Sequence, residues 1–356
     1  MDTHILALFK QSFPKLLKLV VLNLDINNIS DINSLSNLIN LEKLSLEQNK
    51  ILNVDSLSQL IKIYNLGIGF NEIQNIDPLI NLKDIINFRA SDNKISDISI
   101  LRNMNNLTSV TMSDNEIVDV SPLENLNKLT YIQMQGNNIV DILPLSNLRN
   151  LTTLWLFVNE IQDISMLSGD VLNKITTLNI GENEISNIDV LSTFTNVKNL
   201  TISGNPIVSL QPISNLTSIT YLNVGSNVLI ESLDPIAGLV NLTNLNLAIT
   251  RSSDLTILYN FPELTSLMLW ANGISDITPI ASLSKLDYLF LNNNYVEDLT
   301  PLSELTQLTR LYLANNKITD VSPLSTLTNL TKLQLNGNLI TDCTPVDFFE
   351  NSGCGE

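Results

Sequence analysis

Apolar and polar residues follow a pattern that repeats every 22 residues along the chain. Each repeat contains a tract of the form L-x-L-x-x-N, and we term the place of its final asparagine the ladder position. A fixed period of this length is typical of a solenoid built from stacked coils. The sequence therefore predicts fifteen coils, whose ladder positions are Asn27, Asn49, Asn71, Asn93, Asn115, Asn137, Asn159, Asn183, Asn205, Asn227, Thr250, Asn272, Asn294, Asn316 and Asn338.

The residues before the ladder position predict a short strand in every coil. Leu311 and Leu313 alternate with Arg310 and Tyr312, which is the two-residue period of a strand with one buried face. The position of Leu308 is apolar in all fifteen coils, as a continuous buried core requires. We therefore expect the strands of successive coils to stack in parallel over one core.

Proline marks the return path of the coils. A residue such as Asp, Ser or Thr before Pro can serve as a helix N-cap, with Pro in the first helical position, where its missing N–H costs nothing. A short helical turn, α or 3₁₀, is therefore predicted on the convex side. Nine coils carry this proline, seven of them after Asp, Ser or Thr, at Pro78, Pro122, Pro144, Pro212, Pro235, Pro279, Pro301, Pro323 and Pro345.

The repeat spacing departs from 22 residues twice. Two extra residues lie between Asn159 and Asn183, around residues 168–170, and one extra residue lies between Asn227 and Thr250. We expect loop bulges at both places.

Two polar columns are predicted to hold the turns. The ladder asparagines should point inward and bond the backbone of neighbouring coils, because a buried amide must be paired. Each aspartate of the second column is expected to accept N–H groups of the turn. Ca²⁺ between these carboxylates is the alternative, but a calcium site needs further carbonyl ligands, so no metal or other cofactor is predicted. The column lies four residues after the ladder position and comprises Asp31, Asp97, Asp119, Asp141, Asp163, Asp254, Asp276, Asp298, Asp320 and Asp342.

The coil resembles the 22-residue class of leucine-rich repeats in its internalin-like form. The resemblance covers about residues 16–346 and is carried by Asp-Ile-Thr-Pro-Ile at 276–280, Asp-Val-Ser-Pro-Leu at 320–324 and Asn-Leu-Thr-Lys-Leu at 329–333. It implies a right-handed α/β solenoid with a parallel sheet on the concave side and short helical or 3₁₀ turns on the convex side. It also implies a module whose concave sheet holds a protein partner.

The leucine-rich regulatory subunit of type-1 protein phosphatase resembles the chain less closely. It shares the 22-residue period, but its usual segment has Glu and no Pro where this chain has x-Pro-Leu. This second resemblance implies the alternative function, an intracellular regulatory subunit that docks on an enzyme.

Composition excludes several classes of function. The 356 residues include 36 acidic and 19 basic side chains, a formal net charge of −17, which argues against a nucleic-acid partner. One histidine, His4, and two cysteines, Cys343 and Cys354, are too few for a zinc cluster or for Ser/His or Cys/His catalysis. No apolar stretch reaches the length of a membrane span. We therefore expect a monomeric, non-enzymatic protein that does not insert into membranes.

Side chains on the concave sheet occupy the non-leucine places of the strands and vary from coil to coil. Large aromatic residues exposed on a sheet are typical of interface hot spots. Stacking between coils that only stabilises the sheet is the alternative interpretation. The predicted partner-binding residues form two aromatic groups, one of Tyr131, Trp155 and Phe157 and one of Trp270, Tyr288, Phe290 and Tyr312. Acidic residues suited to a basic partner accompany them at Asp92 and Asp114, with Asp25, Glu47 and Glu182 on the same face.

The two ends of the chain are predicted to cap the array of residues 16–346. Residues 1–15 have the apolar pattern of an amphipathic helix that covers the first coil, and residues 347–356 form a C-terminal cap or tail. Cys343 takes a place where other coils have Ile, Val or Leu, so a buried free thiol is predicted. A bridge to Cys354 that pins Phe348 and Phe349 over the last coil is the alternative.

Targeting and modification signals are weak. Four of the seven N-x-S/T sequons share one column, Asn-Leu-Thr before the strand, so the repeat pattern explains them without a glycan. The N-terminus lacks the basic leader and small-residue cleavage site of a signal peptide. A cytoplasmic location is expected by default, and a secreted or cell-surface location is the alternative if a leader was removed.

Overall fold

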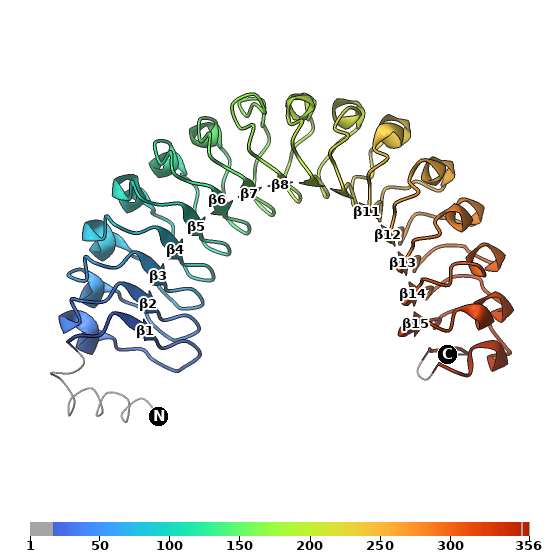
Figure 1. The fold of residues 1–356 in the computed structure, drawn as a ribbon, viewed down its shortest axis with the longest axis horizontal. Helices are drawn as coiled ribbons and strands as arrows, with labels where there is room; N and C mark the ends of the chain where they lie inside the picture. Colours follow the sequence, from blue (N-terminus) through green and yellow to red (C-terminus); the bar gives the residue numbers. More distant parts are fainter. Residues whose placement is uncertain (1–16, 350–351, 356) are drawn as a thin grey trace. The chain divides into compact units, whose positions relative to one another are not determined.

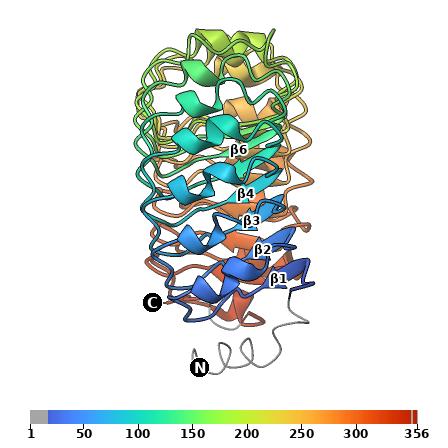
Figure 2. The same ribbon diagram turned by 90° about the vertical axis from the view of Figure 1, so that its left-hand side faces the viewer.

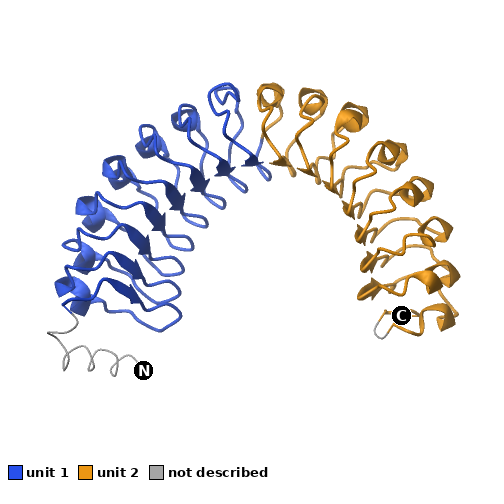
Figure 3. Ribbon diagram, viewed as in Figure 1, with its two compact units in different colours: residues 1–184 blue, residues 185–356 orange. Residues whose placement is uncertain are grey.

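The computed structural model of the chain describes residues 17–349 and 352–355. The N-terminal cap predicted for residues 1–15 lies outside the described residues. The chain divides into two compact units, Met1–Glu184 and Ile185–Glu356 (Figure 3). The predicted cap and array boundaries stay predictions.

Each coil contributes one strand of three residues, and neighbouring strands within a unit pair in parallel in the order of the chain (Figure 1). Equivalent leucines pair in register, as Leu22 does with Leu44 and Leu289 with Leu311. The first unit contains β1 (Val21–Asn23), β2 (Lys43–Ser45), β3 (Asn65–Gly67), β4 (Asn87–Arg89), β5 (Ser109–Thr111), β6 (Tyr131–Gln133), β7 (Thr153–Trp155) and β8 (Thr177–Asn179). The second contains β9 (Asn199–Thr201), β10 (Tyr221–Asn223), β11 (Asn244–Asn246), β12 (Ser266–Met268), β13 (Tyr288–Phe290), β14 (Arg310–Tyr312) and β15 (Lys332–Gln334).

Every helical segment among the described residues is a short 3₁₀ turn. Within each unit the turns lie on the outer side of the curve and the strands on the inner, concave side (Figure 1). Figure 2 shows the turns of the first unit stacked beside its strands. The turns are η1 (Asn33–Asn37), η2 (Asp55–Leu57), η3 (Asp77–Asn81), η4 (Ser99–Asn103), η5 (Ser121–Leu123), η6 (Leu143–Leu145), η7 (Asp189–Thr193), η8 (Gln211–Ile213), η9 (Asp234–Gly238), η10 (Thr256–Asn260), η11 (Thr278–Ser282), η12 (Thr300–Leu302), η13 (Ser322–Thr326) and η14 (Thr344–Val346).

The leucine columns fill the space between strands and turns. The position of Leu308 is buried in every coil from Leu41 to Leu330, and Leu19 of the first coil is partly exposed. The central residue of each strand from β2 onward is buried as well, while the residues on either side of it are mostly not. The predicted parallel solenoid with one buried face per strand is confirmed.

The ladder asparagines bond the backbone of their own coil and of the preceding coil, as predicted. Asn115 Nδ2 donates to Ala90 O of the preceding coil at 3.0 Å and to Met112 O of its own coil at 3.2 Å. Asn115 Oδ1 accepts the N–H of Ile95 at 3.0 Å. One amide therefore satisfies donors and acceptors of two coils at the bend that follows each strand.

Thr250 reproduces this pattern only in part. Its hydroxyl donates to Leu247 O at 2.7 Å within its own coil, whereas Asn272 Nδ2 reaches back to Leu247 O of the preceding coil at 2.8 Å. A hydroxyl has one proton and an amide has two, so Thr250 forms fewer of the bonds that join coils. The extra residue before Thr250 lies in a turn closed by the N–H of Ile230 on Asn227 O.

The aspartate column accepts turn N–H groups in all ten predicted places, from Asp31 to Asp342, at 2.7–2.9 Å. In each case the donor is the residue two positions later, the first of the 3₁₀ turn where the coil has one. The same place in other coils is taken by Asn53, Asn75 and Asn187, whose Oδ1 atoms accept the equivalent N–H.

The expected N-cap before proline is wrong. In η5 the N-cap is Val120, which makes no side-chain capping bond, and Ser121 and Pro122 are already inside the turn. The turn starts one residue earlier than predicted because Asp119 accepts the N–H of Ser121 at 2.8 Å and so fixes the chain before the serine. Proline still occupies an early helical place where no N–H is needed.

The longer coil of the first unit has the expected bulge. Ser168 O accepts the N–H groups of Val171 and Leu172, which closes a turn around the two extra residues. Among the described residues, this coil is the one without a 3₁₀ segment between its ladder position and the next.

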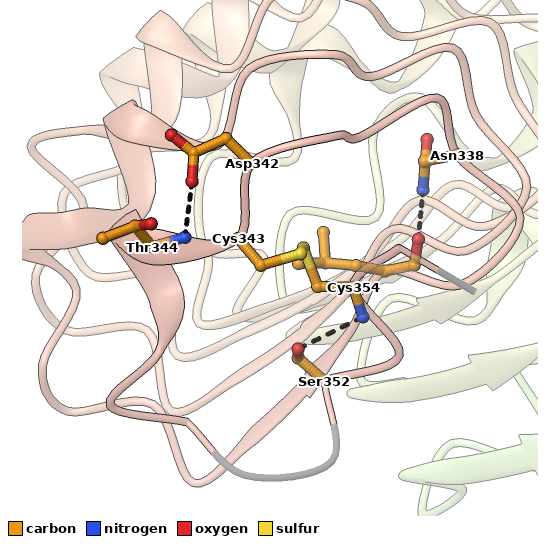
Figure 4. The surroundings of a disulfide bond; sticks show 7 residues. Asn338, Asp342, Cys343, Thr344, Ser352 and Cys354 are labelled. Carbon is orange, nitrogen blue, oxygen red and sulfur yellow. Dashed lines mark hydrogen bonds between the residues drawn. A yellow bond between two sulfur atoms is a disulfide. The ribbon is translucent and has the colours of Figure 1, made fainter.

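The prediction of a free thiol at Cys343 is wrong, because Cys343 forms a disulfide with Cys354 (Figure 4). Cys343 is only partly buried, and the chain after η14 turns back so that Cys354 lies beside it. The same return brings Ser352 O to the N–H of Leu335 at 2.7 Å. One coil earlier, the N–H of Leu313 bonds in the same way to Gln334 O of the coil that follows it. The tail therefore occupies a bonding place that another coil would take.

Candidate partner-binding surface

The strand face is the surface formed by the first and third residues of each strand and by the residue two places before the ladder position. These side chains point away from the leucine core, because side chains alternate along a strand. In most coils they are small or polar, such as Ser45, Thr111 and Asn223. The large aromatic residues on this face are therefore not required by the fold.

The structure brings together part of the first aromatic group. Tyr131 of β6 and Trp155 of β7 have ring centroids 6.4 Å apart, with planes inclined at 48°. Tyr131 Oη donates to Gln133 Oε1 at 2.7 Å, and burial raises the pKa of the Tyr131 hydroxyl. Phe157 follows Trp155 by two residues on the same face and is half-buried.

The second aromatic group is denser. Tyr288 and Phe290 of β13 and Tyr312 of β14 form three ring pairs, with centroid distances of 6.4, 5.6 and 4.9 Å. The guanidinium of Arg310 lies 6.0 Å from the centre of the Tyr288 ring. Burial, and then the neighbouring Tyr312, raise the pKa of Tyr288. Trp270 lies after β12 in the preceding coil and is half-buried.

Asp92 and Asp114 lie on the turn after the strand, not on the strand itself. Both have left-handed backbone conformations, with φ of 53° and 54°. Asp92 is half-buried and Asp114 is exposed, and burial together with the charge of Asp114 raises the pKa of Asp92. A cationic group placed between these two carboxylates would relieve that repulsion.

The residue before every ladder position has positive φ, in all fifteen coils. Sequence reasoning missed this column. Glycine at Gly136, Gly204 and Gly337, with Asp or Asn in four further coils, was the available signal, but the other coils place Ile, Gln, Phe, Val, Glu, Ser or Ala there. The hydrogen bonds of the ladder hold all of them in this conformation.

Glu47, predicted to be available to a basic partner, is already paired. Arg89 Nε lies 2.7 Å from Glu47 Oε1, and Arg89 Nη1 donates to Asn65 Oδ1 at 2.9 Å. The two charged residues come from β4 and from just after β2, and they meet over Gly67 of β3, which has no side chain to separate them.

The column of Asn-Leu-Thr sequons is structural. Asn150, Asn241 and Asn329 donate their Nδ2 groups to carbonyls of the preceding coil at 2.7–2.9 Å. The threonine of the motif does the same, as Thr331 Oγ1 donates to Thr309 O at 3.0 Å. The amide nitrogen to which a glycan would attach is therefore in use.

Over residues 17–349 and 352–355, no three His, Cys, Asp or Glu side chains are grouped so that they could hold a metal ion. In the same part of the chain, no helix has the length and apolar character needed to cross a bilayer.

Comparison with known proteins identifies the repeats. Leucine-rich repeat family models match residues 262–318 and, as two copies, residues 306–348. A search of curated protein sequences found no match.

Solved structures give similarity over most of the chain. An internalin (inlF) of Listeria monocytogenes is 28% identical, over 98% of this chain and 90% of that one, with a TM-score of 0.60. A leucine-rich repeat protein of Leptospira interrogans is 24% identical over 90% of each chain, with a TM-score of 0.73. The ectodomain of the Arabidopsis thaliana receptor kinase GASSHO1/SCHENGEN3, solved in complex with CASPARIAN STRIP INTEGRITY FACTOR 2, is 21% identical over 90% of this chain and 42% of that one, with a TM-score of 0.67.

Proposed function

We propose that this chain, a leucine-rich repeat protein with an internalin-like fold, is a non-enzymatic module that holds a protein partner on its strand face. Solenoids present extended concave surfaces of this kind to their partners. Because the fold is carried by leucine, asparagine and aspartate columns, the strand face is free to vary.

The contact between Phe290 and Tyr312, with ring centroids 4.9 Å apart, is the observation that carries the proposal. Together with Tyr288 these rings form a continuous, half-buried aromatic surface on β13 and β14. Cross-strand aromatic pairs contribute only about 0.2–1 kcal/mol to a sheet. A buried anchor at an interface contributes about 2 kcal/mol or more. Partner binding therefore accounts better than sheet stability for a cluster of three large aromatic side chains on this face.

Charge and the disulfide refine the proposed partner and compartment. The protein has a net charge of −17, and Asp92 and Asp114 form an unpaired acidic edge beside the strand face. A basic partner suits this surface and associates faster because of it. The Cys343–Cys354 bridge favours an oxidising compartment, which supports a secreted or surface location over a cytoplasmic one.

The experiment compares aromatic truncations on and off the strand face. A photoreactive cross-linker at the position of Phe290 is used to capture partners from the native source, and their affinity is then measured by titration. Trp155→Ala with Trp270→Ala is expected to abolish binding, whereas Tyr259→Ala, which removes an exposed aromatic residue from η10, leaves it unchanged. Full affinity of the double variant would contradict the proposal. Capture of a phosphatase would favour the alternative function, a regulatory subunit that docks on an enzyme.

A further inference from the structure

Three unpaired polar atoms lie on successive coils of the strand face of the first unit. Among the described residues, four buried side-chain nitrogen or oxygen atoms have no hydrogen-bond partner, and three of them are Ser113 Oγ, Gln135 Oε1 and Trp155 Nε1. A buried polar group without a partner reduces stability, and native proteins contain few of them. Their concentration in three successive coils therefore needs an explanation.

The sheet register places these residues on three successive coils, with Trp155 two residues earlier in its coil than Ser113 and Gln135 are in theirs. Ser113 and Gln135 both stand two places before a ladder position, and the N–H of Asp114 bonds Gln135 O at 2.8 Å. Trp155 of β7 pairs in register with Gln133 of β6. Neighbouring strands are about 4.8 Å apart, so a group bound over the coil of Gln135 has Ser113 in the coil on one side and Trp155 in the coil on the other.

The chemistry of these three groups is selective. Trp155 Nε1 is a donor, Gln135 Oε1 is an acceptor, and the hydroxyl of Ser113, a residue only 2% exposed, is able to donate. A carboxamide has the matching set, a carbonyl oxygen that accepts and an N–H that donates. A carboxylate has no proton for Gln135, and an ammonium group has no acceptor for Trp155.

We propose that Ser113, Gln135 and Trp155 form a recognition site for one carboxamide of the protein partner. The carbonyl oxygen accepts from Trp155 Nε1 and Ser113 Oγ, and the amide N–H donates to Gln135 Oε1. The inference rests on the proposed function, because it assigns a chemical class to the group that the strand face holds.

Entry of the amide requires neighbouring side chains to move, because the three atoms are buried in the free protein. Tyr131 lies against Trp155, with ring centroids 6.4 Å apart, and is held to Gln133 by one hydrogen bond. Breaking that bond and turning the Tyr131 ring would leave the backbone ladder unchanged, because the bond joins two side chains.

The test uses the full chain and small amides, so it needs no identified partner. Trp155 and Trp270 are the two tryptophans of the protein, and ¹⁵N-tryptophan labelling therefore gives two indole N–H signals, assigned with Trp270→Phe. Acetamide stands for an Asn or Gln side chain, and N-methylacetamide stands for a peptide group. We expect a saturable downfield shift of the Trp155 signal with at least one of them and no saturable shift of the Trp270 signal.

The responding probe identifies the source of the amide. A response to acetamide alone assigns the site to a side chain, and a response to N-methylacetamide assigns it to the main chain. Acetate and methylammonium are matched controls, for which no saturable shift is expected. A saturable response to acetate, or Trp155 and Trp270 shifts that are equal and linear in probe concentration, would overturn the carboxamide assignment.

Two variants separate recognition from packing. Gln135→Met and Ser113→Ala each remove an unpaired polar atom, so the melting temperature should rise or stay constant while the saturable shift is lost. An unchanged shift in both folded variants would overturn the proposal. Failure of the probes together with loss of partner binding in Trp155→Ala with Trp270→Ala would leave the proposed function standing and the carboxamide site wrong.

Discussion

Glu47 and Arg89 meet over Gly67, although 42 residues separate them in the sequence and a whole coil lies between them. Their side chains are 27% and 40% exposed, so solvent screens the pair. The contact depends on the missing side chain of β3. Because Glu47 is paired with Arg89, it is not available to a basic partner, contrary to the expectation from the sequence.

Gly67→Ala should separate Glu47 from Arg89. The added Cβ would lie 2.5 Å from Glu47 Oε1 and 2.7 Å from Arg89 Nη2, so the ion pair must open. We expect a change in unfolding free energy within about 1 kcal/mol, because a partly exposed pair contributes little and alanine suits a strand better than glycine. Urea denaturation at low and high salt should show a different salt dependence from the wild type. Gly238→Ala, where the nearest atom is 3.5 Å away, should show the wild-type salt dependence.

Thr250→Asn should complete the asparagine ladder. The new amide would keep the bond to Leu247 O and add a donor for the preceding coil, a gain of about 1 kcal/mol for one hydrogen bond. Urea midpoints measure the effect, and the reverse change in the neighbouring coil, Asn227→Thr, should destabilise by a similar amount. An unchanged or lower midpoint for Thr250→Asn would show that the extra residue before position 250 has displaced the ladder there.

Val158→Gly should stabilise the first unit. Val158 has a φ of 54°, which strains a β-branched side chain, and the residue is 44% exposed, so little packing is lost. We expect a gain of about 1 kcal/mol from relief of the strain. The matched control is Val140→Gly, at a 47% exposed valine without positive φ, which should lose about 0.5–1 kcal/mol. Equal losses in both variants would contradict the strain at Val158.

The aspartate column should make stability dependent on acid pH. Side-chain and backbone hydrogen bonds from Ser322 lower the pKa of Asp320, and equivalent bonds from Thr278 and Thr300 lower those of Asp276 and Asp298. A lowered folded-state pKa stabilises the fold above the unfolded value of about 3.9, and that contribution disappears as pH falls through the folded value.

Changing Asp276, Asp298 and Asp320 together to Asn should reduce this acid dependence. Other coils use Asn53 and Asn75 in the same place, so the melting temperature at pH 7 should change little. Alanine at the three positions should lower it at every pH. Melting curves between pH 2 and 7 distinguish these outcomes, and an acid transition that is identical in the Asn variant and the wild type would contradict the assignment. Removal of divalent ions by a chelator should leave the melting temperature of the wild type unchanged.

Cys343→Ser with Cys354→Ser should loosen the end of the second unit. The bridge closes a loop of 11 residues and holds the segment whose Ser352 O bonds Leu335 N–H. Hydrogen exchange should accelerate at the Leu335 amide and stay constant in the first unit. Unchanged protection of Leu335 in the double variant would mean that the tail is held without the disulfide.

Sequence patterns predicted the parts of the fold that repeat. The ladder position, the aspartate column and the buried place of Leu308 recur in nearly every coil, so each copy supports the others. Both aromatic groups were also placed correctly on the strand face, because strand alternation fixes which way Phe290 and Tyr312 point. Their role in binding stays a prediction.

Features that occur only once could not be predicted from the repeat pattern. The pairing of Glu47 with Arg89 depends on Gly67 in the coil between them. The bridge between Cys343 and Cys354 was only the alternative to a free thiol, because it depends on how the tail turns back. The unpaired atoms of Ser113, Gln135 and Trp155 depend on side-chain conformations of three coils at once. The displaced N-cap at Val120 shows the same limit, since Asp119, two residues before Ser121, fixes where the turn begins.

The bond between Ser352 and Leu335 bears on self-association. A parallel sheet of identical repeats has no intrinsic stopping point, and its last strand offers unsatisfied amides to any chain that can extend alongside it. Because Ser352 O already accepts the N–H of Leu335, one donor fewer is free just after β15 to pair with a second copy of the chain. The segment around Ser352 thus takes one of the bonding places through which a further strand could add to the sheet.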